Sequence, residues 1–92
     1  MLTFEWDVGK ASANVKKHGV SFSEALTSFR DRLAMTIPDP EHSSEEERYV
    51  LLGFSDRGRL LVVVHAERGD KIRLISARLA NSRERGHYAR LQ

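Results

Sequence analysis

Between residues 48 and 80, apolar positions fall into three short runs separated by tight turns. In order, the runs and turns are 48–55, 56–58, 59–67, 68–70 and 71–80. Apolar runs of this length bounded by turn residues predict strands, and turns this short join antiparallel neighbours. The middle run is apolar at every position from Leu60 to Val64. We therefore expect it at the centre of a sheet with both of its faces covered.

The start of the chain predicts a short strand followed by a helix. Residues 2–7 alternate apolar and polar positions, as a strand does. Asp7 is a favourable N-cap for a helix over residues 8–18, and Gly19 follows as a left-handed stop.

Two further helices are predicted from pairs of residues spaced as capping boxes. Ser21 stands three residues before Glu24, and Asn81 stands three residues before Glu84. The helices that they start are expected to cover residues 22–31 and 82–91. Between them, residues 32–40 predict a short strand that Pro38 and Pro40 cut off, followed by an acidic loop over residues 41–47. The prediction is one α+β domain over residues 1–92, with two N-terminal helices packed on a curled antiparallel sheet and a C-terminal helix.

Composition describes an ordinary soluble globule with 40% apolar and 30% charged residues. The chain has no cysteine, which excludes disulfides and thiolate metal sites. No apolar run is long enough for a membrane span, and the N-terminus does not have the pattern of a signal peptide. We therefore expect a cytoplasmic protein.

Charge is distributed unevenly along the chain. Residues 1–47 hold five Lys and Arg against nine Asp and Glu, whereas residues 48–92 hold ten against four. All but one of the basic residues in the second half are arginines, whose planar guanidinium suits phosphate oxygens. A basic half indicates a polyanion or an acidic partner protein. A solvated surface with chance clustering is the alternative.

The last predicted strand carries arginines whose faces follow from its alternation. Arg73 and Arg78 fall on opposite faces unless a bulge intervenes. Arg78 ends the strand, where it can hold a phosphate while its stem packs on the sheet. Its alternative role is an ion pair with Glu84 or Asp39. Arg57 and Arg59, by contrast, flank a hairpin turn and are expected to be solvated.

Several residues of the final helix and the central strand are candidates for proton transfer or charge stabilisation. Arg85 in the first turn of a helix opposes the helix dipole, which packing does not explain. Glu84 is already explained by its capping box, and Tyr88 by packing one turn further on against Glu84. His65 ends the central strand, and an imidazole with an ordinary pKa near 6.5 suits proton transfer. The alternative for His65 is a hydrogen-bonded core residue, and for His18 a cation that complements the end of its helix.

No histidine pair has a metal-ligand spacing, so we expect neither a metal nor another cofactor. A basic surface that also holds His, Glu and Tyr can cleave RNA without a metal. A base accepts the proton of the 2′-hydroxyl as it attacks the adjacent phosphate, and an arginine meets the charge that develops. DNA lacks that hydroxyl and would stay intact.

Blocks of residues in a fixed order resemble the BrnT toxins of bacterial type II toxin–antitoxin systems. The blocks are F-E-W-D at 4–7, N-x-x-K-H-G-V-S-F-x-E-A at 14–25, E-E-R at 46–48, I-R-L-I-S-A-R-x-A at 72–80 and E-R-x-x-Y at 84–88. The resemblance implies a RelE-like ribonuclease fold and RNA cleavage that arrests translation. It also implies neutralisation by a small ribbon-helix-helix antitoxin, BrnA, in a complex that binds operator DNA and represses its own operon.

The candidate site combines the family's motif residues with His65. The motif residues, which the resemblance supplies, are Lys17, His18, Arg48, Arg73, Arg78, Glu84, Arg85 and Tyr88. We expect catalysis from His65, Arg73, Arg78, Glu84, Arg85 and Tyr88, and RNA binding from Lys17, His18 and Arg48. The competing hypothesis is a non-catalytic basic module that pairs with an acidic partner protein or nucleic acid. A regulator that binds DNA alone lacks a recognition helix.

Overall fold

The computed structural model describes residues 2–39 and 46–91. In these ranges the strands are β1 (Thr3–Glu5), β2 (Met35–Pro38), β3 (Arg48–Phe54), β4 (Leu60–Arg68) and β5 (Lys71–Leu79). The helices are α1 (Val8–His18), α2 (Phe22–Ala25), the 3-10 helix η1 (Leu26–Arg30) and α3 (Ser82–Arg90). The expected acidic loop lies mostly outside the described residues. None of the described helices is long and apolar enough to cross a membrane.

The strands form one sheet in the order β1-β5-β4-β3-β2. Strands β3, β4 and β5 pair antiparallel, which confirms the predicted meander and the central place of β4. The expectation of a wholly antiparallel sheet was wrong at one edge, because β1 pairs parallel with β5. The chain can return in this direction because α1, α2 and the meander lie between the two strands.

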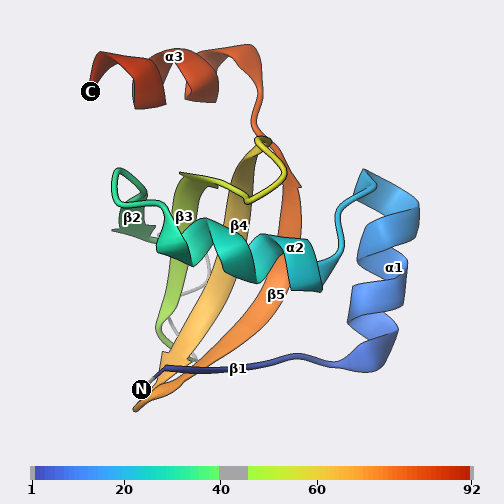
Figure 1. Ribbon diagram of the computed structural model, residues 1–92. Coiled ribbons are helices and arrows are strands. Elements are labelled where there is room, and N and C mark those ends of the chain that lie inside the picture. The colour runs from blue at the N-terminus through green and yellow to red at the C-terminus, as the bar shows by residue number, and fades with distance from the viewer. Residues whose placement is uncertain (1, 40–45, 92) are drawn as a thin grey trace.

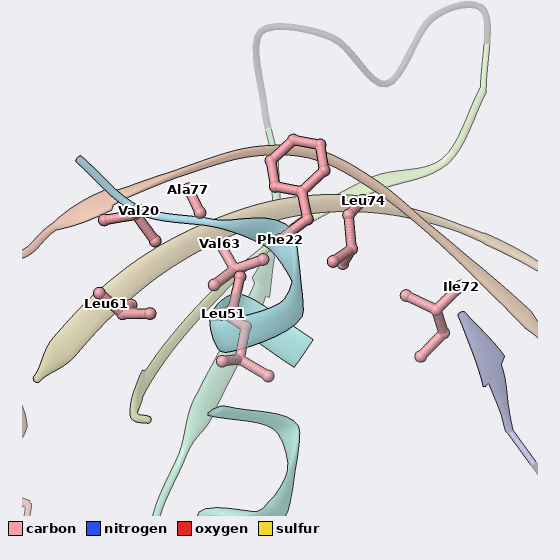
Figure 2. Close-up of a cluster of buried hydrophobic side chains, with 9 residues drawn as sticks. Val20, Phe22, Leu51, Leu61, Val63, Ile72, Leu74 and Ala77 are labelled. Atoms are coloured by element: carbon pink, nitrogen blue, oxygen red, sulfur yellow. The ribbon is translucent and has the colours of Figure 1, made fainter. Parts of the chain in front are cut away.

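Helix α2, with η1, covers one face of the sheet, and α1 lies beside the outer edge of β5 (Figure 1). Val20, Phe22 and Ala25 reach the apolar side chains of β3, β4 and β5 there, and Figure 2 shows Phe22 over this cluster. The predicted second helix is shorter than expected, because its last turn tightens into η1 after Ala25. The Ser21 hydroxyl accepts a hydrogen bond from the backbone N–H of Glu24, as predicted for the N-cap of this helix. The Glu24 side chain does not return to Ser21, however, but bonds Ser55 and Arg59.

The opposite face, which we call the open face, carries a second and smaller apolar cluster. Leu60 and Val62 of β4 contribute to it with Leu52 of β3, and Tyr88 of α3 packs against them. Helix α3 lies beyond the ends of the strands (Figure 1) and begins with the predicted capping box of Asn81 and Glu84. Strand β4 is therefore covered on both sides, as its unbroken apolar run predicted.

A bulge in β5 decides which side chains share a face. Val64 of β4 pairs with Ser76, but the next residue, His65, pairs with Leu74, so that Ile75 is an extra residue. Leu74 and Ala77, three positions apart, both face the helices. Arg73 and Arg78 consequently lie together on the open face, contrary to the regular alternation.

Candidate functional site

A hollow between α1 and β5 gathers positive charge without any acidic neighbour in its lining. It has a volume of about 220 Å³. We call it the cationic hollow, and its lining residues are Lys10, Ala13, Asn14, Lys17, His18, Ile75 and Ser76. Among the described residues, neither Lys10 nor Lys17 forms an ion pair with a carboxylate. Their charge is therefore available to a ligand.

The buried amide of Asn14 fixes α1 against β5 at the cationic hollow. Its Nδ2 donates to the carbonyl oxygens of Val20, at 2.9 Å, and Ala77, at 2.7 Å. Its Oδ1 accepts from the backbone N–H of Ala77 at 3.1 Å. This part of β5 has no strand partner on its outer side, because β1 pairs only with Lys71–Arg73. The amide therefore takes the place of a neighbouring strand and sets His18, one helical turn beyond Asn14, beside the bulge.

Helix periodicity explains why Lys10, Lys17 and His18 of α1 line one hollow. Lys10, Asn14, Lys17 and His18 are spaced at i, i+4, i+7 and i+8, which is one face of a helix. The structure brings together Lys17 and His18, both expected to bind RNA, and adds Lys10 and Ser76. The same periodicity could have identified Lys10 from the sequence. Ser76 could not be found in this way, because its position depends on the bulge.

The groups in the cationic hollow suit a phosphodiester. Two ammonium groups can neutralise phosphate oxygens, and the Ser76 hydroxyl can donate a hydrogen bond to one of them. The half-buried imidazole of His18 can accept or donate a proton. Lys16, Lys17 and His18 also lie in the last turn of α1, where cations complement the helix dipole. That stabilisation explains basic residues in this turn but not their convergence with Lys10 and Ser76.

Arg78 and Glu84 form a bidentate ion pair where β5 leads into α3. The two guanidinium nitrogens of Arg78 each donate to a carboxylate oxygen of Glu84, both at 2.8 Å. Glu84 also accepts from the backbone N–H of Asn81 at 2.9 Å, which completes the capping box. The hydrogen bonds from Arg78 hold the pKa of the Glu84 carboxyl below its ordinary value. The alternative role for Arg78, an ion pair with Glu84, is confirmed.

The other arginines of the strands are also paired. The Nη1 of Arg73 lies 3.4 Å from the Oε2 of Glu5 on β1, and the Nε of Arg48 lies 3.3 Å from the Oε1 of Glu46. Arg68 shares that carboxylate at 3.0 Å. The open face therefore carries guanidinium groups whose charge is balanced locally. Only a ligand that displaces a carboxylate, or approaches the whole pair, can use them.

Tyr88 attaches α3 to the rest of the molecule. Its hydroxyl donates to a carboxylate oxygen of Asp31 at 2.6 Å, and that oxygen also accepts from the backbone N–H of Phe54. The Phe54 ring packs edge-on against Tyr88 with centroids 5.3 Å apart. Burial, together with the bond to Asp31, raises the pKa of Tyr88 to about 12. We expected Tyr88 to pack against Glu84, one helical turn away, but its hydroxyl is held by Asp31. We call Asp31, Arg78, Glu84 and Tyr88 the strand–helix junction.

His65 is a core residue, with only 1% of its surface exposed. Its ring lies between Phe29, which it meets edge-on at 4.9 Å, and Tyr49, on which it stacks at 5.8 Å. Burial lowers the pKa of His65, although Glu67 at 3.4 Å acts in the opposite direction. The side chain lies out of reach of a phosphate, which agrees with the alternative of a core histidine.

Two arginines near the turn before β4 behave differently from each other. The Arg57 side chain is 70% exposed, as expected, although its Nη1 also lies 3.7 Å from the carboxylate of Glu24. The expectation for Arg59 was wrong, because its Nε donates at 2.9 Å to the buried carboxylate of Glu24 and its Nη2 donates to the carbonyl of Gly19. Arg59 is therefore a structural cation. Arg85 is exposed on α3 and forms no ion pair with another described residue.

The described ranges contain no cluster of three or more His, Cys, Asp or Glu side chains that could hold a metal ion.

A search of curated protein sequences found no match. Among solved structures, the chain is similar to the crystal structure of the Brucella abortus ribonuclease toxin BrnT, with a TM-score of 0.70 and 21% identity. The match covers 89% of this chain and 100% of that one, so the two share a fold.

Family membership rests on the sequence itself. The family model described as "Ribonuclease toxin, BrnT, of type II toxin-antitoxin system" matches residues 6–84, which is most of the chain. Three of the five motif blocks that suggested this family, 14–25, 46–48 and 72–80, fall wholly inside the matched range, and the blocks at 4–7 and 84–88 overlap its two ends. The chain belongs to the BrnT family of ribonuclease toxins of type II toxin–antitoxin systems.

Proposed function

We propose that this protein is a metal-independent endoribonuclease of RelE-like architecture that cleaves RNA at the cationic hollow and thereby arrests translation. The observation that carries the proposal is the convergence of Lys10, Lys17, His18 and Ser76 on a space with no carboxylate in its lining. Cations free of carboxylate partners attract phosphate, whereas the electric field of a paired arginine is largely cancelled by its carboxylate partner.

In the proposed reaction, the imidazole of His18 accepts the proton of a ribose 2′-hydroxyl. The 2′-oxygen then forms a bond to the adjacent phosphorus and the bond from phosphorus to the 5′-oxygen breaks, leaving a 2′,3′-cyclic phosphate. Lys10 and Lys17 meet the negative charge that develops on the phosphate oxygens, and a lysine ammonium can protonate the departing 5′-oxygen. The lysines supply this charge stabilisation from the chain itself.

The residues outside the cationic hollow have other roles in this proposal. Arg85, which is exposed, attracts the RNA backbone at a distance, whereas Arg48 and Arg73 are held by Glu46 and Glu5 and contribute little to that attraction. Glu84, Arg78 and Tyr88 hold α3 in place. These roles replace the expected catalytic set of His65, Arg73, Arg78, Glu84, Arg85 and Tyr88.

The proposed partners follow from membership of a toxin–antitoxin family. We propose that a ribbon-helix-helix antitoxin covers the open face of the sheet, which carries Arg73 and Arg78, and inhibits the toxin directly. Operator DNA would then be bound only through the antitoxin complex, and the toxin would act in the cytoplasm. A complex that cut RNA as fast as the free protein would contradict direct inhibition.

The decisive experiment is cleavage of labelled RNA by the purified protein in excess EDTA, with DNA of the same sequence as a control. We expect cut RNA ending in a cyclic phosphate, and intact DNA. Cleavage that chelation abolishes and magnesium restores would overturn the metal-free mechanism. Binding of RNA without cleavage would favour the competing hypothesis of a basic binding module.

A further inference from the structure

An apolar groove lies on the open face, between the sheet and α3. It has a volume of about 280 Å³. Its lining residues are Met35, Ile37, Val50, Leu52, Val62, Glu84, His87 and Leu91. Two of its large apolar side chains are exposed, since Ile37 on β2 is 59% exposed and Leu91 after α3 is 62% exposed. Exposed apolar surface arranged around a hollow is typical of an interaction site.

The lining of the apolar groove suits side chains of a protein better than a small molecule. Sites for drug-sized ligands usually have volumes from about 300 to 1,000 Å³ and several converging polar groups. This groove is smaller, and Glu84 and His87 are the polar residues in its lining. Glu84 is already bonded to Arg78 and Asn81. Two or three large apolar side chains presented by a partner would fill the space.

The charge beside the apolar groove indicates what surrounds those apolar side chains in the partner. A second hollow of about 520 Å³ adjoins it along α3, sharing Glu84 and His87. Arg83 and Arg90 line this second hollow, and among residues 2–39 and 46–91 neither forms an ion pair. A segment seated in the groove would therefore gain from carboxylates that reach these two guanidinium groups.

We propose that the apolar groove docks an acidic segment of the cognate antitoxin, which inserts at least two large apolar side chains and pairs its carboxylates with Arg83 and Arg90. The inference rests on the proposed function, since it takes the partner to be the protein antitoxin of this toxin. RNA is a poor occupant, because six of the eight lining residues are apolar and none is a lysine or arginine. Arg83 and Arg90 speed encounter and add salt dependence, while the apolar side chains hold the complex together.

The strand order separates this dock from the proposed site of cleavage. The cationic hollow lies at the outer edge of β5, whereas the apolar groove crosses β4, β3 and β2. The two share no lining residue. Antitoxin binding and RNA cleavage can therefore be lost independently, even where the rest of the antitoxin shields RNA from the hollow.

The test measures binding of the purified cognate antitoxin to three variants, with RNA cleavage by each free variant measured in parallel. Ile37→Glu places a carboxylate in the groove at a side chain that is already exposed. Leu2→Glu is its matched control, because Leu2 is 57% exposed and precedes β1 at the opposite edge of the sheet. The double variant Arg83→Glu, Arg90→Glu reverses the neighbouring charge.

We expect Ile37→Glu to weaken antitoxin binding by about 30-fold or more, the effect of losing a strong interface residue. Cleavage by free Ile37→Glu, and both properties of Leu2→Glu, should match the parent within about twofold. The charge-reversed variant should bind more weakly and lose its dependence on salt. If the parent cuts no RNA and these binding differences persist, the proposed cleavage fails while the dock stands.

Three results would overturn the inference. The first is antitoxin binding by Ile37→Glu as tight as that of the parent, or no binding by the parent itself. The second is a free parent that is dimeric by light scattering and an Ile37→Glu variant that is monomeric, which would assign the groove to a second copy of this chain. The third is an equal loss of RNA affinity in Ile37→Glu, which would assign the groove to RNA.

Discussion

The cationic hollow and the strand–helix junction both hold residues that we expected to act on RNA, yet the fold treats the cations of the two regions in opposite ways. In the hollow, Lys10, Lys17 and His18 face a space without carboxylates. At the junction, Arg78 is held by two hydrogen bonds to Glu84. The difference teaches that the number of cations in a segment does not measure its capacity for a polyanion. What matters is the number that the fold leaves without a carboxylate partner.

The largest expected effect separates the two regions by activity. His18→Ala should lower the rate of RNA cleavage by about 10²–10⁴-fold, the usual contribution of a general base, with an unchanged melting temperature. Lys16→Ala is the matched control, because Lys16 lies in the same helical turn but does not line the cationic hollow. Unchanged cleavage by His18→Ala in a gel-based rate assay would move the active site away from the hollow.

The next effect concerns the residue that builds the cationic hollow. Asn14→Ala should lower the free energy of unfolding by about 2–4 kcal/mol, because it leaves backbone groups of Val20 and Ala77 buried without partners. Asn81→Ala, which removes an exposed helix cap, should cost about 1 kcal/mol. Urea titrations of both variants give the comparison. Equal losses would mean that the amide of Asn14 does not hold α1 against β5.

A pH effect tests the junction through Tyr88. Its pKa rises from an ordinary value of 10 to about 12 on folding, so the protonated hydroxyl stabilises the folded state. This stabilisation is fully present below pH 10 and is lost as the pH rises from 10 to 12, by on the order of 2 kcal/mol. Tyr88→Phe should remove that part of the decline, as followed by urea unfolding at each pH. An identical decline in the variant would show that another group is responsible.

The smallest effect is expected for Arg78, which the sequence suggested as a phosphate-binding residue. Arg78→Ala should cost about 1 kcal/mol of stability, because the ion pair is partly solvated, and should slow cleavage less than tenfold. Glu84→Gln keeps the capping residue's hydrogen-bonding capacity, so a double-mutant cycle with Arg78→Ala isolates the pair. Arg57→Ala, at an exposed position, serves as a control with almost no effect. A hundredfold loss of cleavage in Arg78→Ala at unchanged melting temperature would instead make the junction the active site.

Arg78 forms an ion pair, whereas Lys17 forms none with another described residue. This difference shows what a sequence cannot reveal about charge. Both were candidates for contact with RNA, and their residue types suited the task equally. Glu84 lies close to Arg78 in the sequence, so their pairing could be foreseen as an alternative. The pairing of Arg59 with Glu24 joins residues on separate elements, and no local pattern distinguishes it from solvation. Ion pairs between distant segments depend on the packing of the whole chain.

The sequence by itself determined the elements of this protein and their order. The helix that Asp7 caps and Gly19 ends, the capping box at Asn81, and the meander with β4 at its centre all follow from short-range rules. Hydrogen bonds of caps and turns span only a few residues, and an apolar run needs burial wherever it lies. Such signals are readable without knowing the fold.

Only the tertiary structure decided which side chains meet. The bulge at Ile75 brings Arg73 and Arg78 to one face and sets Ser76 near His18. The bulge lies in the register between β4 and β5, next to Ala77, whose backbone N–H donates to the Oδ1 of Asn14 on α1. The contact of Tyr88 with Asp31 likewise joins residues that lie 57 positions apart in the sequence. Contacts of this kind are selected by the packing of several elements at once, because each is stable only when the others have already excluded water.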